Sequence, residues 1–382
     1  MASISNIPEQ SANDAPTPQL AISDDNDDYI TTAAYLPDGR IVTGSKSGAV
    51  RVWNSQSGEQ EGTSMEHENE TSGLVVTLDG AKIISGDIDG QIKVWDVESH
   101  KLVKTWTHPE FYPVVAISPD DRLVTVGGWT VGIYTTEGER VNSIKVSEYS
   151  WSLSFSPDGN KLACGAGNDI FIYDVKSGTR VLGPFKGHDD YINCVLWSCN
   201  GTRLFSASSD KTIRCWNTGT GEQIGQPWTG HTGCISSLSL APDGTLLASA
   251  SLDNTVRFWD TIHGRSARQH LQHNRPVRSV RFSPSGEFVA SGDEDGSIYL
   301  GQVPQPNSMQ HHVITPFMHC IFLLIFIVSQ VTPAFSDVRH SGFRSHTPLI
   351  LCVALMRVPS RNRTCTPRSC FACEHFLNGA II

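Results

Sequence analysis

Three residue types that together carry out nucleophilic catalysis lie close in the chain: His188, Ser206 and Asp210, followed by Trp216. A serine hydroxyl becomes a nucleophile when a histidine takes its proton and an aspartate orients that histidine. Taken alone, this set indicates a hydrolase. Its repetition argues against that interpretation, because an enzyme needs one such site in one cleft.

The same four residue types recur with the same spacing, in which His, Ser and Asp precede Trp by 28, 10 and 6 residues. The further sets are His67, Ser85, Asp89 and Trp95, and His231, Ser249, Asp253 and Trp259; a last set, His273, Ser291 and Asp295, ends in Gly301. The sequence contains no GxSxG, GxxxxGK[ST] or HExxH motif. We therefore expect a structural role for these residues and no enzyme activity, metal or cofactor.

A turn phrase recurs about every forty residues and predicts the elements that position these side chains. It reads LPDG at 36, LDG at 78, SPDD at 118, SPDG at 156, SCNG at 198, APDG at 241 and SPSG at 283. Alternating apolar runs flank each turn, as strands do, and a third run closes each copy at Trp53, Trp95, Tyr134, Tyr173, Trp216, Trp259 and Gly301. The chain is thus an all-β protein of seven repeats.

These copies resemble WD40 repeats through Gly187-His188, Gly230-His231, the SPDG turns and the endings DKTIRCWN and DNTVRFWD. The resemblance implies a seven-bladed β-propeller over residues 18–304, closed by residues 18–23 as the outer strand of blade seven. It also implies that the repeated His, Ser, Asp and Trp form buried hydrogen-bonded tetrads. Blade one has Ser47 at the Asp position and no matching His, and blades three and four end in Tyr, so their tetrads are incomplete.

The two ends of the chain differ from the repeats. Residues 1–17 are polar and acidic, which predicts a disordered segment without a signal peptide. Residues 305–382 hold six Arg, no Lys and two acidic residues, and show no period, which predicts a poorly ordered tail that could be an artefact of the gene structure. The apolar run 320–328 is too short for a membrane helix, and Cys365, Cys370, Cys373 and His375 lack the context of a metal site.

Charge and cysteine content limit the classes of partner and the cellular compartment that can be expected. Residues 1–304 hold 23 basic and 37 acidic residues, a balance that argues against nucleic acid as a partner. Their five cysteines, mostly in strand-like runs, are expected to be buried reduced thiols. We expect a monomeric propeller in the cytoplasm or nucleus that does not bind membranes.

The function expected is a non-enzymatic scaffold that binds a protein or peptide on one face of the ring. A sensor or regulatory module related to those of signalling NTPases or ribosome-assembly factors is the alternative, and a hydrolase is the alternative of another class. Strand register places the candidate partner-binding residues near one mouth of the ring: Trp129, Trp151, Asn193, Arg278 and Glu294. Trp151 stands out because the equivalent positions of other blades are polar.

Gly301 occupies a position that the repeat builds for an aromatic ring. Its blade keeps the other tetrad members, so the missing ring removes both packing and an N–H donor. We expect Gly301→Trp, in a chain ending near Pro304, to stabilise the fold by about 1–3 kcal/mol.

Overall fold

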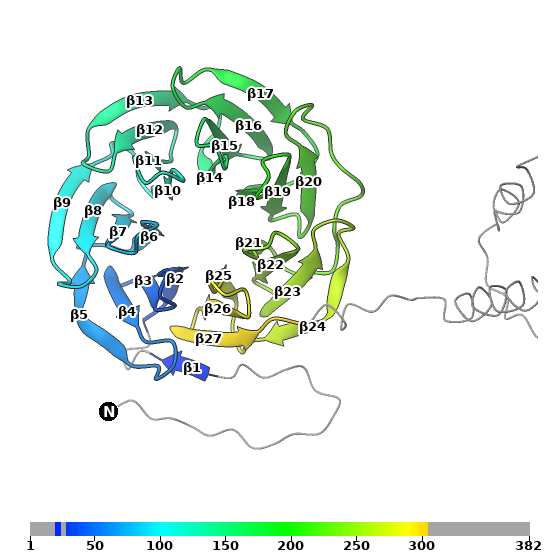
Figure 1. Cartoon of the computed structure of the whole chain (residues 1–382). Helices are drawn as coiled ribbons and strands as arrows, with labels where there is room; N and C mark the ends of the chain where they lie inside the picture. The colour runs from blue at the N-terminus through cyan, green and yellow to red at the C-terminus, as the bar shows by residue number, and fades with distance from the viewer. Residues whose placement is uncertain (1–19, 24–27, 305–382) are drawn as a thin grey trace, which may run out of the picture. The chain divides into compact units, whose positions relative to one another are not determined.

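The computed structural model describes residues 20–23 and 28–304, and this part of the chain consists of β-strands joined by turns and loops. Its 27 strands form seven antiparallel sheets, the blades of a ring around a central channel (Figure 1). The predicted seven-bladed propeller is confirmed. The expectations about residues 1–17 and 305–382, including the apolar run and the Cys/His group, lie outside the described residues. None of the described elements is a helix long and apolar enough to span a membrane.

Blades one to four each have four strands, which follow one another from the channel outward. Blade one has β2 (Ile30–Tyr35), β3 (Ile41–Ser45), β4 (Ala49–Trp53) and β5 (Gln60–Glu66). Blade two has β6 (Thr71–Val76), β7 (Lys82–Asp87), β8 (Gln91–Asp96) and β9 (Leu102–Thr107). Blade three has β10 (Val115–Ile117), β11 (Leu123–Val126), β12 (Thr130–Thr135) and β13 (Arg140–Lys145). Blade four has β14 (Ser150–Phe155), β15 (Lys161–Ala166), β16 (Asp169–Asp174) and β17 (Arg180–Phe185).

Blade five has three strands, and the last two blades have four. Blade five has β18 (Ile192–Trp197), β19 (Arg203–Ser208) and β20 (Ile213–Asn217), with isolated bridges Ile213 to Trp228 and Trp216 to Gln223 in place of an outer strand. Blade six has β21 (Ile235–Leu240), β22 (Leu246–Ser251), β23 (Thr255–Asp260) and β24 (Ser266–Gln272). Blade seven has β25 (Val277–Phe282), β26 (Phe288–Asp293), β27 (Ser297–Gln302) and β1 (Leu20–Ser23).

The ring closes because its last blade takes its outer strand from the start of the described chain. β1 pairs antiparallel with β27, with Leu20 opposite Leu300 and Ser23 opposite Ser297. The predicted closing strand is thus confirmed for residues 20–23. Closure of this kind pairs strand edges that would otherwise be open to other chains.

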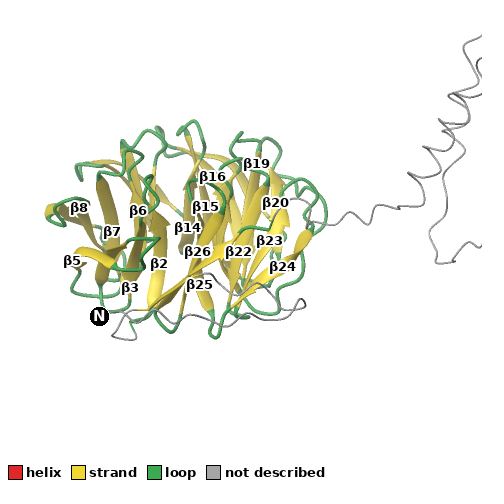
Figure 2. Cartoon of the chain, turned by 60° about the horizontal axis from the view of Figure 1, so that its bottom comes forward, coloured by secondary structure: helices red, strands yellow, loops and turns green. Residues whose placement is uncertain are grey.

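Loops gather at the two ends of the strands and form two faces (Figure 2). We call the end with loops 67–70, 108–113, 188–191, 231–234 and 273–276 the His-loop face. The opposite end, with the repeated turns such as 36–39 and 283–286, is the Pro-turn face. In the turn of blade six, Asp243 Oδ1 accepts the Thr245 N–H at 2.9 Å, and Gly244 takes the positive φ of 72° that closes the turn.

Apolar side chains pack between neighbouring blades. Met65 of β5 belongs to one buried cluster with Trp95 of blade two, and Trp53 of blade one shares a cluster with Ile298 of blade seven. The contact across the closure is therefore of the same kind as the contact between blades adjacent in sequence. This packing buries the inner strands such as β7, leaves outer strands such as β9 largely exposed, and positions the loops around the channel.

Side-chain hydroxyls also join the innermost strands across blade boundaries. Ser239 Oγ accepts the N–H of Phe282 at 2.9 Å, and Ser279 Oγ accepts the N–H of Ala33 at 3.2 Å across the closure. The described cysteines are free thiols, and only Cys164 and Cys215 are buried. The expectation of buried thiols is wrong for Cys199, which is exposed because it lies in a turn of the Pro-turn face.

Candidate functional site

Blades five and six contain the polar chain that resembles a catalytic triad. In blade five, His188 Nδ1 lies 2.7 Å from Asp210 Oδ2 and its Nε2 lies 2.7 Å from Ser206 Oγ. Trp216 Nε1 donates to the same Ser206 Oγ at 2.8 Å. The carboxylate and the indole fix the directions of these bonds, because a carboxylate only accepts and an indole N–H only donates.

The equivalent group of blade six has nearly the same geometry. His231 lies 2.8 Å from Asp253 and 2.7 Å from Ser249, and Trp259 Nε1 donates to Ser249 Oγ at 2.8 Å. Burial would raise the pKa of Asp253, yet hydrogen bonds from His231 and Thr255 outweigh it and hold that pKa well below its usual value. The carboxylate is therefore ionised and strongly bound.

The serine hydroxyls of these two networks are too deeply buried to act as nucleophiles. Ser206 and Ser249 are completely inaccessible, and each hydroxyl already accepts an indole N–H. A nucleophile has to reach the carbon it attacks, which these hydroxyls cannot do. What the arrangement does is join the His-loop to the strands below it, because every polar group in the chain depends on its neighbour.

Blades two and seven use a different aspartate from the one that spacing indicated. His67 Nδ1 lies 3.3 Å from Asp87 Oδ2, while Asp89 accepts a bond from Asn69 at 2.8 Å. His67 Nε2 lies 2.7 Å from Ser85 Oγ, which also accepts the Trp95 N–H at 2.8 Å. The expected place of Asp89 in the tetrad is therefore corrected to Asp87.

The same correction applies to Asp295. His273 Nδ1 lies 3.5 Å from Asp293 Oδ2 and its Nε2 lies 3.0 Å from Ser291, whereas Asp295 pairs with Arg275 at 3.0 Å near the surface. Blades two and seven have Asp at a strand end where blades five and six have Ser, and this buried carboxylate reaches the histidine first. The Asp-x-Asp spacing at 87–89 and 293–295 was the signal in the sequence.

Blades one, three and four hold reduced versions of the network. In blade one, Trp53 donates to Thr43 Oγ1 at 2.8 Å, and Asp28 accepts the Ser47 N–H at 3.0 Å. In blade three, the buried His108, which spacing did not reveal, lies 3.0 Å from the Tyr134 hydroxyl through its Nδ1. In blade four, Cys164 stands where Ser stands in blades two, five and six, and Tyr173 closes the unit.

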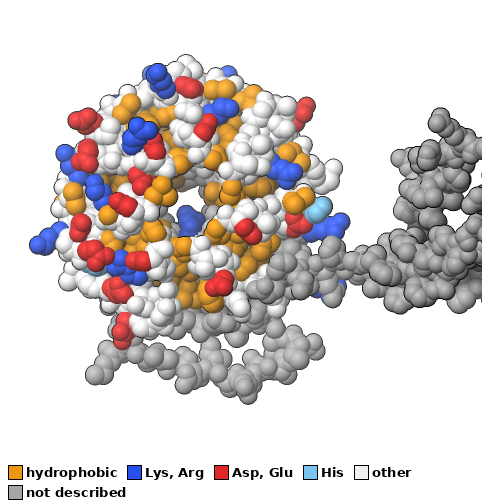
Figure 3. Space-filling view, viewed as in Figure 1, with side chains coloured by type: hydrophobic (Ala, Val, Ile, Leu, Met, Phe, Trp, Pro, Cys, Tyr) orange, Lys and Arg blue, Asp and Glu red, His pale blue; other side chains and the backbone are white. Residues whose placement is uncertain are grey.

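Three candidate partner-binding residues line the central channel, a cavity of about 550 Å³. These are Trp151, Asn193 and Arg278. The channel opens at the centre of the ring in Figure 3. Asn193 is held by bonds to Ser209 Oγ at 3.0 Å and Ile235 O at 2.9 Å. The polar positions are thus engaged within the protein, whereas Trp151 keeps 43% of its surface exposed.

Arg278 and Glu294 bind each other on the blade-seven side of the mouth. Arg278 Nη2 lies 2.6 Å from Glu294 Oε1, which also accepts the Tyr29 hydroxyl at 3.0 Å. The guanidinium lies 5.6 Å from the centre of the Tyr29 ring, and Lys46 approaches the same ring at 5.9 Å. We call Tyr29, Lys46, Arg278 and Glu294 the paired cluster.

Trp129 and Trp151 are brought together on the other side of the mouth by a residue that sequence reasoning missed. Tyr149 lies between them, with its ring centre 6.1 Å from that of Trp129 and 4.6 Å from that of Trp151. We call these three residues the aromatic cluster. Trp129 is 54% exposed, so the cluster presents indole surface to solvent. The EYSW stretch at 148–151 was the signal in the sequence.

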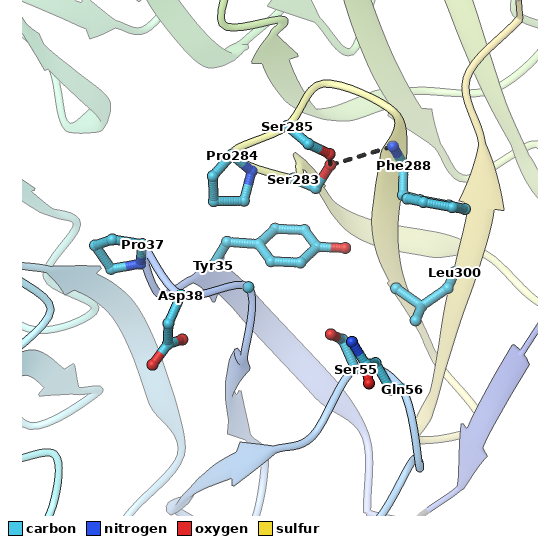
Figure 4. A pocket seen from close by; sticks show the side chains of 11 residues that line it. Tyr35, Pro37, Asp38, Ser55, Gln56, Ser283, Pro284, Ser285, Phe288 and Leu300 are labelled. Carbon is cyan, nitrogen blue, oxygen red and sulfur yellow. Dashed lines mark hydrogen bonds between the residues drawn. The ribbon is translucent and has the colours of Figure 1, made fainter.

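A second hollow of about 550 Å³ lies on the Pro-turn face, where blades seven and one meet. Figure 4 shows Tyr35 between the turns that carry Pro37 and Pro284, with Leu300 beside it. Among the described residues that line it, Asp38 is the one charged side chain, and it is paired with Arg40 at 2.7 Å. Within residues 20–23 and 28–304, no group of His, Cys, Asp and Glu is arranged to hold a metal ion.

Comparison with known proteins agrees with this architecture. The family "WD domain, G-beta repeat" matches residues 18–54 and 58–96, and the family "IFT122 first beta-propeller" matches residues 149–314. These matches fall on the blades and on the repeated polar network. The chain therefore contains WD40 repeats at residues 18–54 and 58–96, within a seven-bladed propeller.

Several WD40-repeat relatives are similar over part of this chain. WD repeat-containing protein 1 of Gallus gallus is 27% identical over 40% of this chain and 34% of its own length. Periodic tryptophan protein 2 of Arabidopsis thaliana is 26% identical over 50% of this chain and 22% of its own. An intraflagellar transport protein 122 homolog of Danio rerio is 40% identical over 19% of this chain and 6% of its own.

The chain spans about a third of the length of the WD repeat-containing protein 1 sequences that it matches. Propellers of this family serve in general as protein-interaction scaffolds and are typically without catalytic activity.

Proposed function

We propose that this propeller is a non-enzymatic scaffold that binds a protein or peptide on its His-loop face, centred on the channel mouth. The observation that carries the proposal is the aromatic cluster, in which two tryptophans of adjacent blades expose about half of their surface beside the channel. Tryptophan is enriched among residues that dominate binding energy, and exposed indole is costly to leave in water.

The rigidity of the site supports the same proposal. The Tyr149 hydroxyl donates to the backbone carbonyl of Tyr112 at 3.0 Å and also contacts that of Phe111, so blade four is tied to the loop that leads into blade three. A pre-organised aromatic surface loses little conformational entropy when a partner binds.

Capture of a partner by the full-length chain tests this proposal. Wild type and the double variant Trp151→Ala/Arg278→Ala are used as baits, with bound proteins identified by mass spectrometry. We expect the partners held by wild type to be lost from the variant, while its circular dichroism and melting temperature stay close to wild type. Ile262→Ala is the matched control, because Ile262 is 67% exposed but lies near a turn of the Pro-turn face.

Retention of all partners by the double variant, or their loss from Ile262→Ala, would place the binding surface elsewhere. We further propose that the chain acts as a monomer in the cytoplasm or nucleus. The free thiols among the described cysteines support a reducing compartment. Light scattering of the purified chain and imaging of a fluorescent fusion check these two points.

A further inference from the structure

We propose that the aromatic cluster receives a lysine or arginine side chain of the bound partner. This inference rests on the proposed function and adds the chemical class of the segment that binds. It follows from a difference between the two sides of the channel mouth, where similar side chains are combined in different ways.

The paired cluster shows a complete arrangement of ring, cation and carboxylate. The Tyr29 ring has Arg278 and Lys46 near it, and Glu294 binds both Arg278 and the Tyr29 hydroxyl. A cation near an aromatic ring is attracted by the ring's electron density, and a nearby carboxylate adds to that attraction. On this side of the mouth the protein supplies all three parts.

The aromatic cluster has rings and carboxylates but no cation of its own. Among the described residues, cations lie near the rings of Tyr29, Trp95 and Phe171, and near none of the three rings of the cluster. The exposed faces of Trp129 and Trp151 are therefore available to a cation from another molecule.

Two glutamates lie near the segments that carry the aromatic cluster. Glu110 packs against the turn that carries Trp129, since a Cβ added to Gly128 would lie 2.7 Å from Glu110 Cβ. Burial chiefly raises the pKa of Tyr149 to about 12, and the charge of Glu110 contributes to that rise.

The second glutamate, Glu148, adjoins Tyr149 in sequence and packs against the turn at Gly167, where an added Cβ would lie 3.2 Å from its Cγ. Neither Glu110 nor Glu148 forms an ion pair with any residue that the structure describes. Carboxylates without an ion-pair partner, near the segments that carry exposed indole rings, favour a cationic group and disfavour an anionic one.

Selection of peptides from a random dodecapeptide library by the full-length chain tests the inference. Wild type is compared with Glu110→Gln/Glu148→Gln, which keeps the shape of both side chains and removes their charge. The control variant Glu139→Gln/Glu287→Gln makes the same change at two exposed glutamates of the Pro-turn face. Each selected peptide is then titrated against every variant through the tryptophan fluorescence of the protein.

We expect wild type and the control to enrich peptides with Lys or Arg, and the Glu110/Glu148 variant to bind those peptides roughly tenfold more weakly. Replacing the basic residue of a selected peptide by norleucine should produce a similar loss. Raising the salt concentration should weaken wild type more than the charge-neutral variant, because salt screens the carboxylates.

The outcomes separate this inference from the proposed function. Peptides that need Trp151 but carry no enriched Lys or Arg, or that bind equally well without the two carboxylates, would overturn the inference and leave the binding face in place. Peptides that bind independently of Trp151 and Arg278, or the absence of any selected peptide, would count against both.

Discussion

Blades five and six hold their histidines between two partners, whereas blade three gives its histidine one and blade four has neither the histidine nor the serine. His188 and His231 each link a loop aspartate to a strand serine at 2.7–2.8 Å. His108 of blade three lies 3.0 Å from the Tyr134 hydroxyl through its Nδ1, and its Nε2 is buried without a hydrogen-bond partner among the described residues. Blades three and four, which have the less complete networks, also carry the aromatic cluster.

We expect blades five and six, whose histidines link loop to strand, to be more firmly held than blades three and four, on which the aromatic cluster lies. Substitutions in both kinds of blade test how far this division goes.

The largest effect is expected when the bridging histidine is removed. His188→Ala leaves the Asp210 carboxylate and the Ser206 hydroxyl buried without their partner, so we expect the free energy of unfolding to fall by about 3 kcal/mol. His108→Ala also removes an imidazole but leaves only the Tyr134 hydroxyl without its partner. We therefore expect the free energy of unfolding to fall by about 1 kcal/mol. Urea melts followed by circular dichroism compare the two; equal losses would remove the distinction between the blades.

Blade seven offers a way to build the missing part of a network. A Cβ at Gly301 would overlap Leu271 Cδ1 of β24, so the space expected for a tryptophan ring is filled by a leucine of blade six. In the Leu271→Ala background, we expect Gly301→Trp to stabilise the chain by about 1–3 kcal/mol. With Leu271 present the gain should be smaller, because the leucine has to move.

A double-mutant cycle over Gly301 and Leu271 measures this coupling. Equal gains in both backgrounds would show that Leu271 moves at no cost. A loss in both would mean that Tyr299, whose ring centre lies 4.5 Å from that of His273, already serves in place of the indole.

The single-partner histidine of blade three should produce a pH dependence. Burial lowers the pKa of His108 to about 4, below the value of about 6.5 expected in the unfolded chain. The unfolded state therefore binds more protons between these values, so stability falls as the pH is lowered through this window. We expect the decline to be shallower in His108→Gln, as measured by urea melts at about pH 7, 5.5 and 4.5.

The pH range below about 4 tests the aspartates of blades five and six. The pKa of Asp210 and Asp253 is held below the usual value, so their contribution is present above about pH 3.8 and is lost as the pH falls further. Wild type and His108→Gln should therefore decline in parallel there. Parallel curves at every pH would show that His108 titrates as it does in the unfolded chain.

The smallest expected effect is a difference in local opening without any substitution. Amide hydrogens of β11 and β15 should exchange faster than those of β19 and β22, since the loops above them are less firmly joined to the strands. Hydrogen exchange followed by mass spectrometry of peptides from each blade measures this. Uniform protection around the ring would show that packing between blades, and not the polar network, sets the local stability.

The sequence predicted the repeat number, the three inner strands of each copy and the closing strand, because turn phrases and apolar alternation report local structure directly. It also located the histidines of blades two, five, six and seven. It misassigned Asp89 and Asp295, because a spacing rule cannot tell which of two nearby carboxylates is buried.

Contacts between different blades could not be read from the period. Leu271 against Gly301 joins neighbouring sheets, and the position of Tyr149 between two tryptophans depends on how blades three and four meet. His108 was missed because it precedes Tyr134 by 26 residues, two fewer than the spacing found elsewhere. Side chains that meet across a blade boundary depend on the three-dimensional packing of the ring.

The pairing of β1 with β27 has a consequence for the synthesis of the protein. Leu20 leaves the ribosome about 280 residues before Leu300, its partner. At roughly 5–20 residues per second, the first strand waits on the order of 15–55 s for the strand it pairs with. During that interval the apolar surface of Ile41 and Trp53, which later packs on blade seven, is open to chaperones and to neighbouring nascent chains.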